Sequence, residues 1–273
     1  MLLITGAKGQ LGTELSKLLP DAIVSDVSDL DITDKTAVNT YVKEHNVDTI
    51  INCAAYTAVD KAEADTELAN KINVIGPKNL AQSGTKVIHI STDYVFDGTS
   101  YRPYSETDTP HPVSVYGKTK LAGERAVLDN AKSAIIIRTA WLYSPYGNNF
   151  VKTMRRLGAE KSSLRVVCDQ VGTPTYAGDL AQAIVDILPQ FKEGHRGVYH
   201  FSNQGVCSWY DFAVEIMKQS GLSCQVMPIE TRDYPTAATR PFYSVLNKSK
   251  IIAEFNVNIP HWKESLEKCL KQF

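Results

Sequence analysis

The chain has 273 residues, of which 43% are hydrophobic and 22% are charged. This is the composition of a globular protein with ample material for a core. The formal net charge of −1 excludes the broad positive surface with which proteins hold nucleic acid or anionic membranes. We therefore expect no nucleic-acid partner and no membrane partner, and any acidic ligand must be held by local groups.

The cysteines are odd in number, scattered and without CxxC spacing, so the sequence predicts neither a disulfide framework nor a zinc site. They are Cys53, Cys168, Cys207, Cys224 and Cys269. Residues 1–6 have no basic region and too short an apolar run for a signal peptide. No stretch approaches the ~18 apolar residues of a membrane span. We expect a cytoplasmic protein.

The first predicted strand, Leu2–Ile4, leads into a turn with glycines at positions 6, 9 and 12. Leucines at helical spacing follow the turn. A strand, a glycine turn and a helix form the context of a dinucleotide-binding turn, because glycines let the backbone approach a pyrophosphate and the helix N-terminus presents unpaired N–H groups. Position 8 is lysine, where the GxGxxG pattern has glycine.

Asp26 follows the second predicted strand, Ile23–Ser25, and lies twenty residues beyond Gly6. An acid at this place typically binds the adenosine ribose hydroxyls and disfavours a 2′-phosphate. Alternatively, it is a turn aspartate in the Asp-rich loop 26–31. Asp31 and Ile32 could flank the adenine. The choice between NADPH and NADH therefore stays open.

Three more strands are predicted at Thr49–Asn52, Lys86–Ile90 and Ala134–Ile137, with helical regions between them. One helix runs from Asp34 to about residue 45, and another region reaches about residue 83 with a break or kink near Gly76 and Pro77. Five strand–helix alternations without an internal repeat predict an α/β fold, a doubly wound, Rossmann-like parallel sheet.

After residue 145 the alternation loosens. We interpret residues 1–145 as the dinucleotide-binding region and 146–273 mainly as a smaller C-terminal substrate-binding lobe. Elements at about 178–201 are expected to return to the Rossmann-like core. Arginines of the last seventy residues, including Arg232 and Arg240, could pair with phosphates, although solvated surface positions are the alternative.

Tyr116 and Lys120 are four residues apart, which places both on one face of a helix that Ser114 can cap. An ammonium beside a phenol lowers its pKa from ~10, so that the tyrosine can protonate a carbonyl oxygen while a hydride arrives at the carbon. This composition supplies about one such pair by chance, so the pair gains meaning only from its context.

Thr92 supplies part of that context, because it follows the fourth strand at the sheet edge where α/β proteins place their chemistry. Its hydroxyl could bond a substrate oxygen; a turn or helix cap is the alternative. Trp141 leaves the fifth strand, where its ring could line a sugar pocket or pack in the core.

In this order and context, the motifs resemble the extended short-chain dehydrogenase/reductase superfamily over essentially the whole chain. The resemblance is strongest to the dTDP-4-dehydrorhamnose reductase family, on residues 52–63, 91–96, 116–124, 147–150 and 169–175. It implies reduction of the C4 ketone of dTDP-4-dehydro-β-L-rhamnose with NADPH, NADH being possible. A nucleotide sugar is thus the expected partner molecule.

The resemblance also implies residue roles. Tyr116, Lys120 and Thr92 are the expected catalytic residues, and Thr92, Asp93, Trp141 and Arg240 line the substrate site. Cofactor contacts are expected from Gly6, Gly9, Gln10, Leu11, Gly12, Asp26, Asp31, Ile32, Ala54, Ala55, Tyr56, Tyr116 and Lys120. Some relatives form homodimers through Mg²⁺. Glu14 matches one of their ligand positions, but no other ligand is identified, so both the metal and the dimer stay open.

Three rival functions fit parts of the pattern. A 4,6-dehydratase would need an acid–base pair after Thr92, but Asp93 is followed by Tyr94. An epimerase or another nucleotide-sugar reductase would share most of the motifs. A regulatory subunit of methionine adenosyltransferase resembles the same group and would bind NADP without turnover.

Overall fold

The computed structural model describes residues 1–273. Its centre is a sheet of six strands in the order β10-β5-β4-β3-β1-β2, and every pairing in it is parallel. The strands are β1 (Leu2–Thr5), β2 (Ile23–Ser25), β3 (Thr49–Asn52), β4 (Lys86–Thr92), β5 (Ala134–Thr139) and β10 (Arg196–His200). This confirms the predicted doubly wound parallel sheet.

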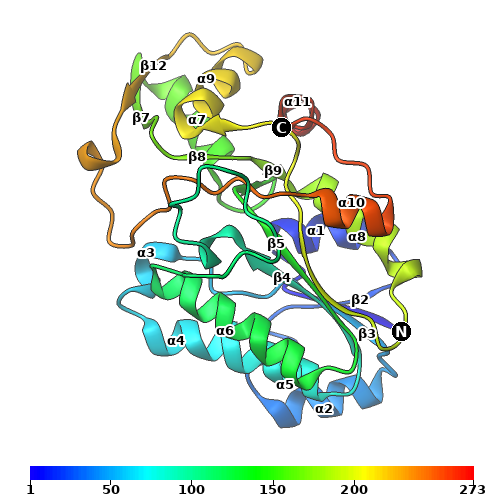
Figure 1. The fold of residues 1–273 in the computed structure, drawn as a ribbon. Helices are drawn as coiled ribbons and strands as arrows, with labels where there is room; N and C mark the ends of the chain where they lie inside the picture. The colour runs from blue at the N-terminus through cyan, green and yellow to red at the C-terminus, as the bar shows by residue number, and fades with distance from the viewer.

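Successive strand residues point to opposite faces of the sheet, and each face has its own core. Ile4 and Ile88 pack with α1 (Gln10–Leu18) and α8 (Ala177–Ile187) on one face. On the other face, Leu3 packs with α2 (Lys35–Glu44) and α5 (Gly76–Gln82), and Val87 packs with α5 and α6 (Val115–Asn130). Helices therefore cover the sheet on both sides (Figure 1), as its continuous apolar strands require.

The helical region predicted to end near residue 83 is divided into four pieces. They are α3 (Val59–Ala62), α4 (Thr66–Asn70), a π-helical turn (Lys71–Ile75) and α5. The π turn lies just before Gly76 and Pro77, where the sequence predicts a kink. Proline cannot donate a backbone hydrogen bond and its ring crowds the preceding turn, which the wider π geometry accommodates.

The remaining helices and strands pack around a second core that includes Tyr143, Tyr176, Phe212 and Trp262. They are α7 (Phe150–Glu160), α9 (Trp209–Gln219) and α11 (Trp262–Leu270), with β7 (Ser163–Val167) parallel to β12 (Gln225–Ile229). Two short pairs, β6 (Leu142–Tyr143) with β9 (Thr175–Tyr176) and β8 (Val171–Gly172) with β11 (Cys207–Ser208), connect this region. α10 (Ser249–Phe255) packs against β10. Short 3₁₀ turns lie at Asp93–Val95, Leu188–Gln190 and Thr231–Asp233.

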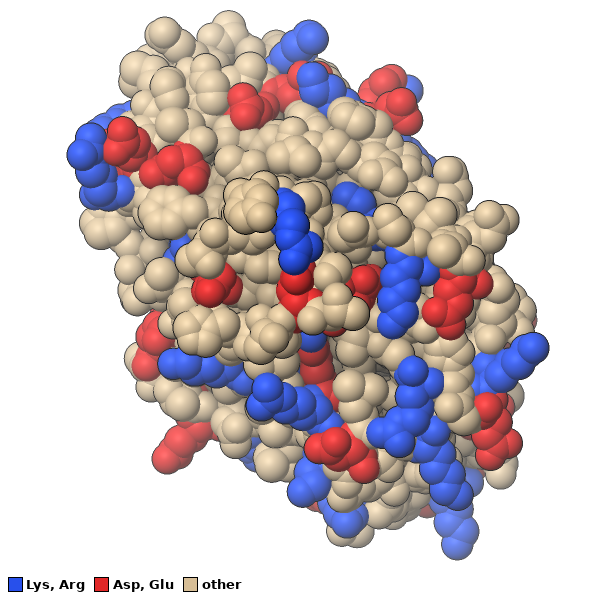
Figure 2. All heavy atoms as spheres, viewed as in Figure 1, with Lys and Arg blue, Asp and Glu red and all other residues tan.

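The chain returns to the central sheet at β10, where Val198 pairs with Ile136 of β5. The division of the chain at residue 145 stays a prediction. No helix combines the length and the hydropathy needed to cross a membrane. On the face drawn in Figure 2, acidic and basic side chains are interspersed.

Candidate active site

A cavity of ≈540 Å³ lies at the carboxyl ends of the central strands. Its lining combines the glycine turn after β1, the ends of β4 and β5, and the start of α6. Among the lining residues are Gly6, Gly9, Gln10, Leu11, Gly12, Thr92, Asp93, Tyr116, Lys120 and Trp141. The fold therefore brings most of the predicted site residues to one cavity, although they are up to 135 positions apart in the sequence.

A second cavity of ≈350 Å³ extends the first along the sheet edge. The two share Gly6, Gly9, Cys53 and Ala55 in their linings. Asp26, Asp31, Ile32 and Ala54 line the second cavity. Tyr56 is in neither lining, and its hydroxyl donates to Oδ2 of Asp65 at 2.9 Å. The joined cavities provide a long groove over the glycine turn, as an extended dinucleotide requires.

The glycine turn is shaped for close backbone approach. Gly6 has φ +67°, and a Cβ at this position would lie 2.7 Å from the Ala54 nitrogen. A Cβ at Gly12 would collide with the Gly6 carbonyl oxygen. The N–H groups at the start of α1 have no helical partners, so the turn offers donors to a pyrophosphate. The residues present thus fit a dinucleotide cofactor.

Asp26 holds the turn through its carboxylate. Oδ2 accepts the backbone N–H of Lys8 at 3.1 Å, and Oδ1 accepts that of Val27 at 2.8 Å. In this geometry Asp26 has the turn role that the sequence leaves as its alternative. A contact of Asp26 with a ribose stays a prediction.

Asp31 accepts both the N–H and the hydroxyl of Thr33, and these bonds lower the pKa of its carboxyl.

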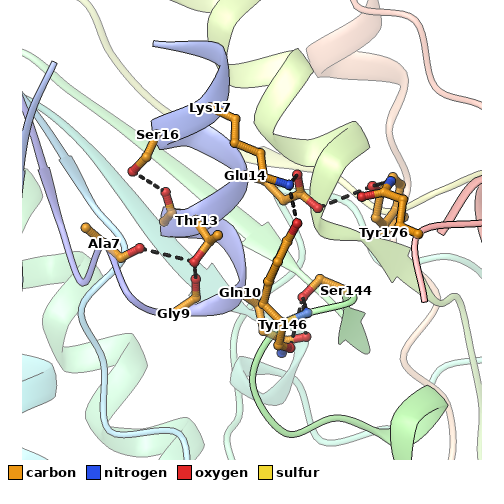
Figure 3. Close-up of polar contacts among 12 residues, drawn as sticks. Ala7, Gly9, Gln10, Thr13, Glu14, Ser16, Lys17, Ser144, Tyr146 and Tyr176 are labelled. Carbon is orange, nitrogen blue, oxygen red and sulfur yellow. Dashed lines mark hydrogen bonds and ion pairs between the residues drawn. The ribbon is translucent and has the colours of Figure 1, made fainter. Parts of the chain in front are cut away.

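Gln10 is attached to the segment after β6 through its side chain (Figure 3). Oε1 accepts the Ser144 hydroxyl at 3.1 Å and the Asn149 amide at 2.9 Å. The sequence predicts only a cofactor contact for Gln10 and gives no local signal of this long-range bond. The first turn of α1 is therefore fixed to the other side of the cavity.

Glu14, for which the resemblance suggests a magnesium-ligand position, lies buried on α1 (Figure 3). Its carboxylate accepts the Tyr176 hydroxyl at 3.2 Å and lies 3.5 Å from Nζ of Lys17. No cluster of three or more His, Cys, Asp or Glu side chains suited to a metal occurs in the structure. Glu14 thus has protein partners.

The helix that carries Tyr116 and Lys120 begins as predicted. Ser114 Oγ accepts the Gly117 N–H at 3.1 Å and caps α6. Tyr116 meets the ring of Tyr94 edge-on, with 5.4 Å between centroids. Nζ of Lys120, which is buried, donates to the Ile90 carbonyl at 2.7 Å. Both side chains line the same cavity.

The prediction that Lys120 lowers the pKa of Tyr116 is wrong for this structure. Burial raises the pKa of Tyr116 to about 12, the Thr92 side chain partly opposes this, and the Asp93 charge adds to it. Lys120 does not offset the effect, because its ammonium is directed at Ile90 and burial lowers its own pKa to about 8. Tyr116 is consequently a neutral phenol at pH 7, which suits a proton donor.

Thr92 and Asp93 are buried beside Tyr116. Thr92 Oγ1 donates to Asp93 Oδ1 at 3.0 Å and accepts the Tyr94 N–H at 3.2 Å. Oδ2 of Asp93 is buried without a hydrogen-bond partner. Burial raises the pKa of Asp93 to about 6, against the opposing effect of the Ser244 and Thr92 hydroxyls. The carboxylate therefore retains unused acceptor capacity next to the cavity.

Trp141 is held in a strained backbone conformation with φ +48°. Its indole stacks on Trp209 with centroids 3.6 Å apart and planes 9° apart. The two rings present an aromatic surface between the cavities, because Trp141 lines the first and Trp209 a third of ≈530 Å³. Sequence reasoning missed Trp209, since nothing near it in the chain indicates a site.

Arg240 lies in the third cavity, which shares Val59 and Tyr94 with the first. Nη2 forms an ion pair with Asp60 at 2.6 Å, and the guanidinium lies 6.0 Å from the Tyr94 ring centroid. Its Nη1 is buried without a partner. Arg240 is thus no solvated surface arginine, and it keeps a free donor.

Comparison with known proteins gives a consistent result over the full length. The family model described as "RmlD substrate binding domain" matches residues 1–273. A dTDP-4-dehydrorhamnose reductase of Aggregatibacter actinomycetemcomitans is 43% identical, with 97% of each chain covered.

Solved structures show the same similarity. A dTDP-4-dehydrorhamnose reductase of Clostridium acetobutylicum has a TM-score of 0.95 and 47% identity, covering 99% of this chain and 98% of its own. The Bacillus anthracis reductase in complex with NADP has a TM-score of 0.96 and 41% identity, covering 100% and 99%. The chain described here therefore belongs to the RmlD substrate-binding-domain family, that of the dTDP-4-dehydrorhamnose reductases.

Proposed function

We propose that this protein reduces the C4 ketone of dTDP-4-dehydro-β-L-rhamnose to give dTDP-L-rhamnose, with hydride from NADPH or NADH. The observation that carries the proposal is the single cavity that holds the Tyr116 phenol together with Thr92 and the glycine turn. The full-length similarity to enzymes named dTDP-4-dehydrorhamnose reductase supports the choice of substrate.

Each catalytic group has a physical task. The bound nicotinamide supplies the hydride. Tyr116 gives its proton to the ketone oxygen as negative charge develops there, and the Thr92 hydroxyl turns its proton from Asp93 Oδ1 to donate a hydrogen bond to the same oxygen. In the proposed complex, the Lys120 ammonium, which points at the Ile90 carbonyl in this structure, would turn toward the phenolate that Tyr116 becomes and would hold ribose hydroxyls of the cofactor.

The substrate would extend from the first cavity into the third. Asp93 Oδ2, buried without a partner, can accept a sugar hydroxyl. The stacked Trp141 and Trp209 provide an apolar surface for a sugar ring. Arg240 keeps a free Nη1 that can donate to a diphosphate oxygen.

The cofactor would lie along the two joined cavities, with its pyrophosphate at Gly9, Gln10 and Leu11. Binding of NADP by the Bacillus anthracis relative supports NADPH. Lys8 supports it further, because this exposed residue is bonded through its backbone N–H to Asp26 of the second cavity, and its Nζ lies 3.5 Å from Ser28 Oγ. A cation there can pair with a 2′-phosphate.

The test is a reduction assay with enzymatically made dTDP-4-keto-6-deoxy sugar. Oxidation of NADPH and of NADH is followed by the loss of reduced-nicotinamide absorbance at about 340 nm, and the sugar product is identified by NMR. We expect one cofactor molecule consumed per ketone reduced. Product formation without net cofactor consumption would indicate an epimerase instead.

A regulatory subunit of methionine adenosyltransferase type would behave differently. It would bind NADP and a stoichiometric partner enzyme and would leave the ketone intact. A homodimer and a cytoplasmic location are further parts of the proposal, and sedimentation velocity and cell fractionation test them.

A further inference from the structure

A buried chain of polar side chains connects the end of β1 to Lys120. Thr5 Oγ1 donates to Asn52 Oδ1 at 2.8 Å, and Asn52 Nδ2 lies 2.9 Å from Nδ1 of His89. Nε2 of His89 lies 3.5 Å from Nζ of Lys120. All four side chains are at least nine-tenths buried, so no water shell screens their mutual orientation.

Backbone geometry fixes how these groups donate and accept. The Ala54 N–H lies 3.1 Å from Asn52 Oδ1. A backbone N–H can only donate, so the atom facing it must be the amide oxygen, and the amide nitrogen must face His89. Asn52 therefore donates to Nδ1 of His89, which must carry a lone pair. The single proton of the neutral imidazole is then on Nε2.

The imidazole is neutral, because burial and the nearby Lys120 charge hold the pKa of His89 well below its ordinary value. Its Nε2–H consequently faces Lys120. An ammonium has three donors and no acceptor, so it gains nothing from this N–H and is repelled by its positive end. The neutral amine has a lone pair and can accept the same N–H.

We propose that His89 is a positioning residue: it presents an N–H to Lys120, disfavours the ammonium form of that lysine in addition to burial and thereby lowers the upper pH limit of catalysis. The inference rests on the proposed function for its catalytic consequence. When Tyr116 gives up its proton, an ammonium that turns from the Ile90 carbonyl toward it steadies the phenolate, so turnover falls as Lys120 loses its proton. His89 thus acts together with burial on the pH at which this happens.

The other titratable groups around Lys120 act differently. Glu124 from α6 favours the ammonium, whereas Cys53, a thiol whose pKa burial raises to about 12, and the Tyr116 phenol are neutral at pH 7. The Glu124 carboxylate is engaged by Arg138, with 2.7 Å between Oε2 and Nη2, and by the Ser91 hydroxyl. His89, from β4, is therefore the titratable neighbour whose orientation works against the charge on Lys120.

The tautomer can be measured without any assay of activity. The chain has six histidines, so ¹⁵N–¹H correlation spectra of ¹⁵N-histidine-labelled protein can resolve them, with His89→Gln assigning the signal. We expect a neutral ring protonated on Nε2 throughout pH 6–9. A ring protonated on Nδ1, or an imidazolium in that range, would overturn the proposal.

The effect on Lys120 is tested with two substitutions. His89→Gln lets an amide oxygen turn toward Nζ, whereas His89→Asn keeps an acceptor for Asn52 and removes the group that faces Nζ. In lysine-labelled protein, with Lys120→Met for assignment, both should raise the pH at which Lys120 titrates, by about one unit, the size of one charge-assisted hydrogen bond.

The pH above which kcat falls should rise in parallel with the pH at which Lys120 titrates. His45→Gln, at an exposed position on the C-terminal end of α2, is the matched control and should change neither quantity. A folded His89→Gln or His89→Asn protein in which Lys120 titrates as in the wild type would reject the proposal. Absence of ketone reduction in the wild type would reject the proposed function alone, because the two NMR measurements still decide the role of His89.

Discussion

Arg240 and Asp60 are 180 residues apart in the chain, yet Nη2 and Oδ2 form an ion pair of 2.6 Å. Asp60 also accepts the Ala238 N–H at 3.0 Å, so it holds the loop as well as the guanidinium. The pair leaves Nη1 of Arg240 buried and unpartnered. Asp60 thus positions an arginine whose remaining donor is available to a ligand.

Arg240→Ala should therefore weaken binding of the nucleotide sugar and spare binding of the cofactor. Loss of a charge-assisted hydrogen bond to phosphate costs about 1.5–3 kcal/mol, so we expect KM to rise at least ~10-fold. Steady-state kinetics give KM and kcat, and fluorescence titration gives the Kd for NADPH.

Arg232→Ala is the matched control, since Arg232 is exposed and pairs only with the neighbouring Glu230 at 2.9 Å. It should leave KM unchanged. An unchanged KM for Arg240→Ala would remove Arg240 from the substrate site.

Tyr116→Phe removes the proton donor and little else. The ring keeps its edge contact with Tyr94, so the fold and the cofactor affinity should be preserved. Turnover should fall at least ~10²-fold, the lower end for a general acid. Single-turnover kinetics under saturating NADPH measure the loss. Tyr101→Phe, at a side chain that is 92% exposed, should react at the normal rate; near-normal turnover of Tyr116→Phe would reject the assignment.

The local motifs explain why so much of the fold and site was predictable. A strand, a glycine turn and a helix occupy consecutive residues, and Tyr116 and Lys120 lie on one helix turn, so spacing alone places them. Trp141 and Trp209, or Asp60 and Arg240, meet only after the whole chain has folded. Their pairing leaves no periodicity in the sequence. The predicted direction of the Tyr116 pKa shift was wrong for the same reason, because that pKa depends on burial and on where Nζ of Lys120 points in the folded protein.

Gly6→Ala should weaken cofactor binding through steric conflict. The residue has φ +67°, and the added Cβ would lie 2.7 Å from the Ala54 nitrogen. Backbone displacement there would disturb the turn that presents donors to the pyrophosphate. We expect the Kd for NADPH to rise at least ~10-fold. This effect on binding is separate from the ~1–2 kcal/mol by which a left-handed alanine destabilises the fold.

Gly84→Ala controls for that strain, because Gly84 also has positive φ (+86°) but no atom within 4 Å of an added Cβ. It should lower the melting temperature slightly and leave NADPH affinity unchanged. Equal Kd values for the two variants would show that the close approach at Gly6 has no bearing on the cofactor.

Asp93→Asn should make the protein more stable near pH 7.5 and less active. Burial raises the pKa of this carboxyl to about 6, above its value of ~3.9 in an unfolded chain. Between these values the folded protein holds a proton that the unfolded chain lacks, so stability falls as pH rises through about 4–6. Above pH 6 the buried Asp93 charge destabilises the fold by its full amount. This is on the order of 3 kcal/mol for a shift of about two pKa units at 1.36 kcal/mol per unit. Asparagine carries no charge and removes that penalty.

Asp97→Asn supplies a control of opposite sign. Burial acts to raise the pKa of Asp97, but hydrogen bonds from Thr99 and Tyr104 hold it below its ordinary value. Its charge therefore stabilises the fold above its unfolded pKa, and removing it should lower stability at pH 7.5. Chemical denaturation at pH 4.5 and 7.5 separates the two variants: the gain from Asp93→Asn should shrink at the lower pH. A loss of stability for Asp93→Asn at pH 7.5 would mean that the carboxylate is satisfied in the fold and has no spare acceptor for a sugar hydroxyl.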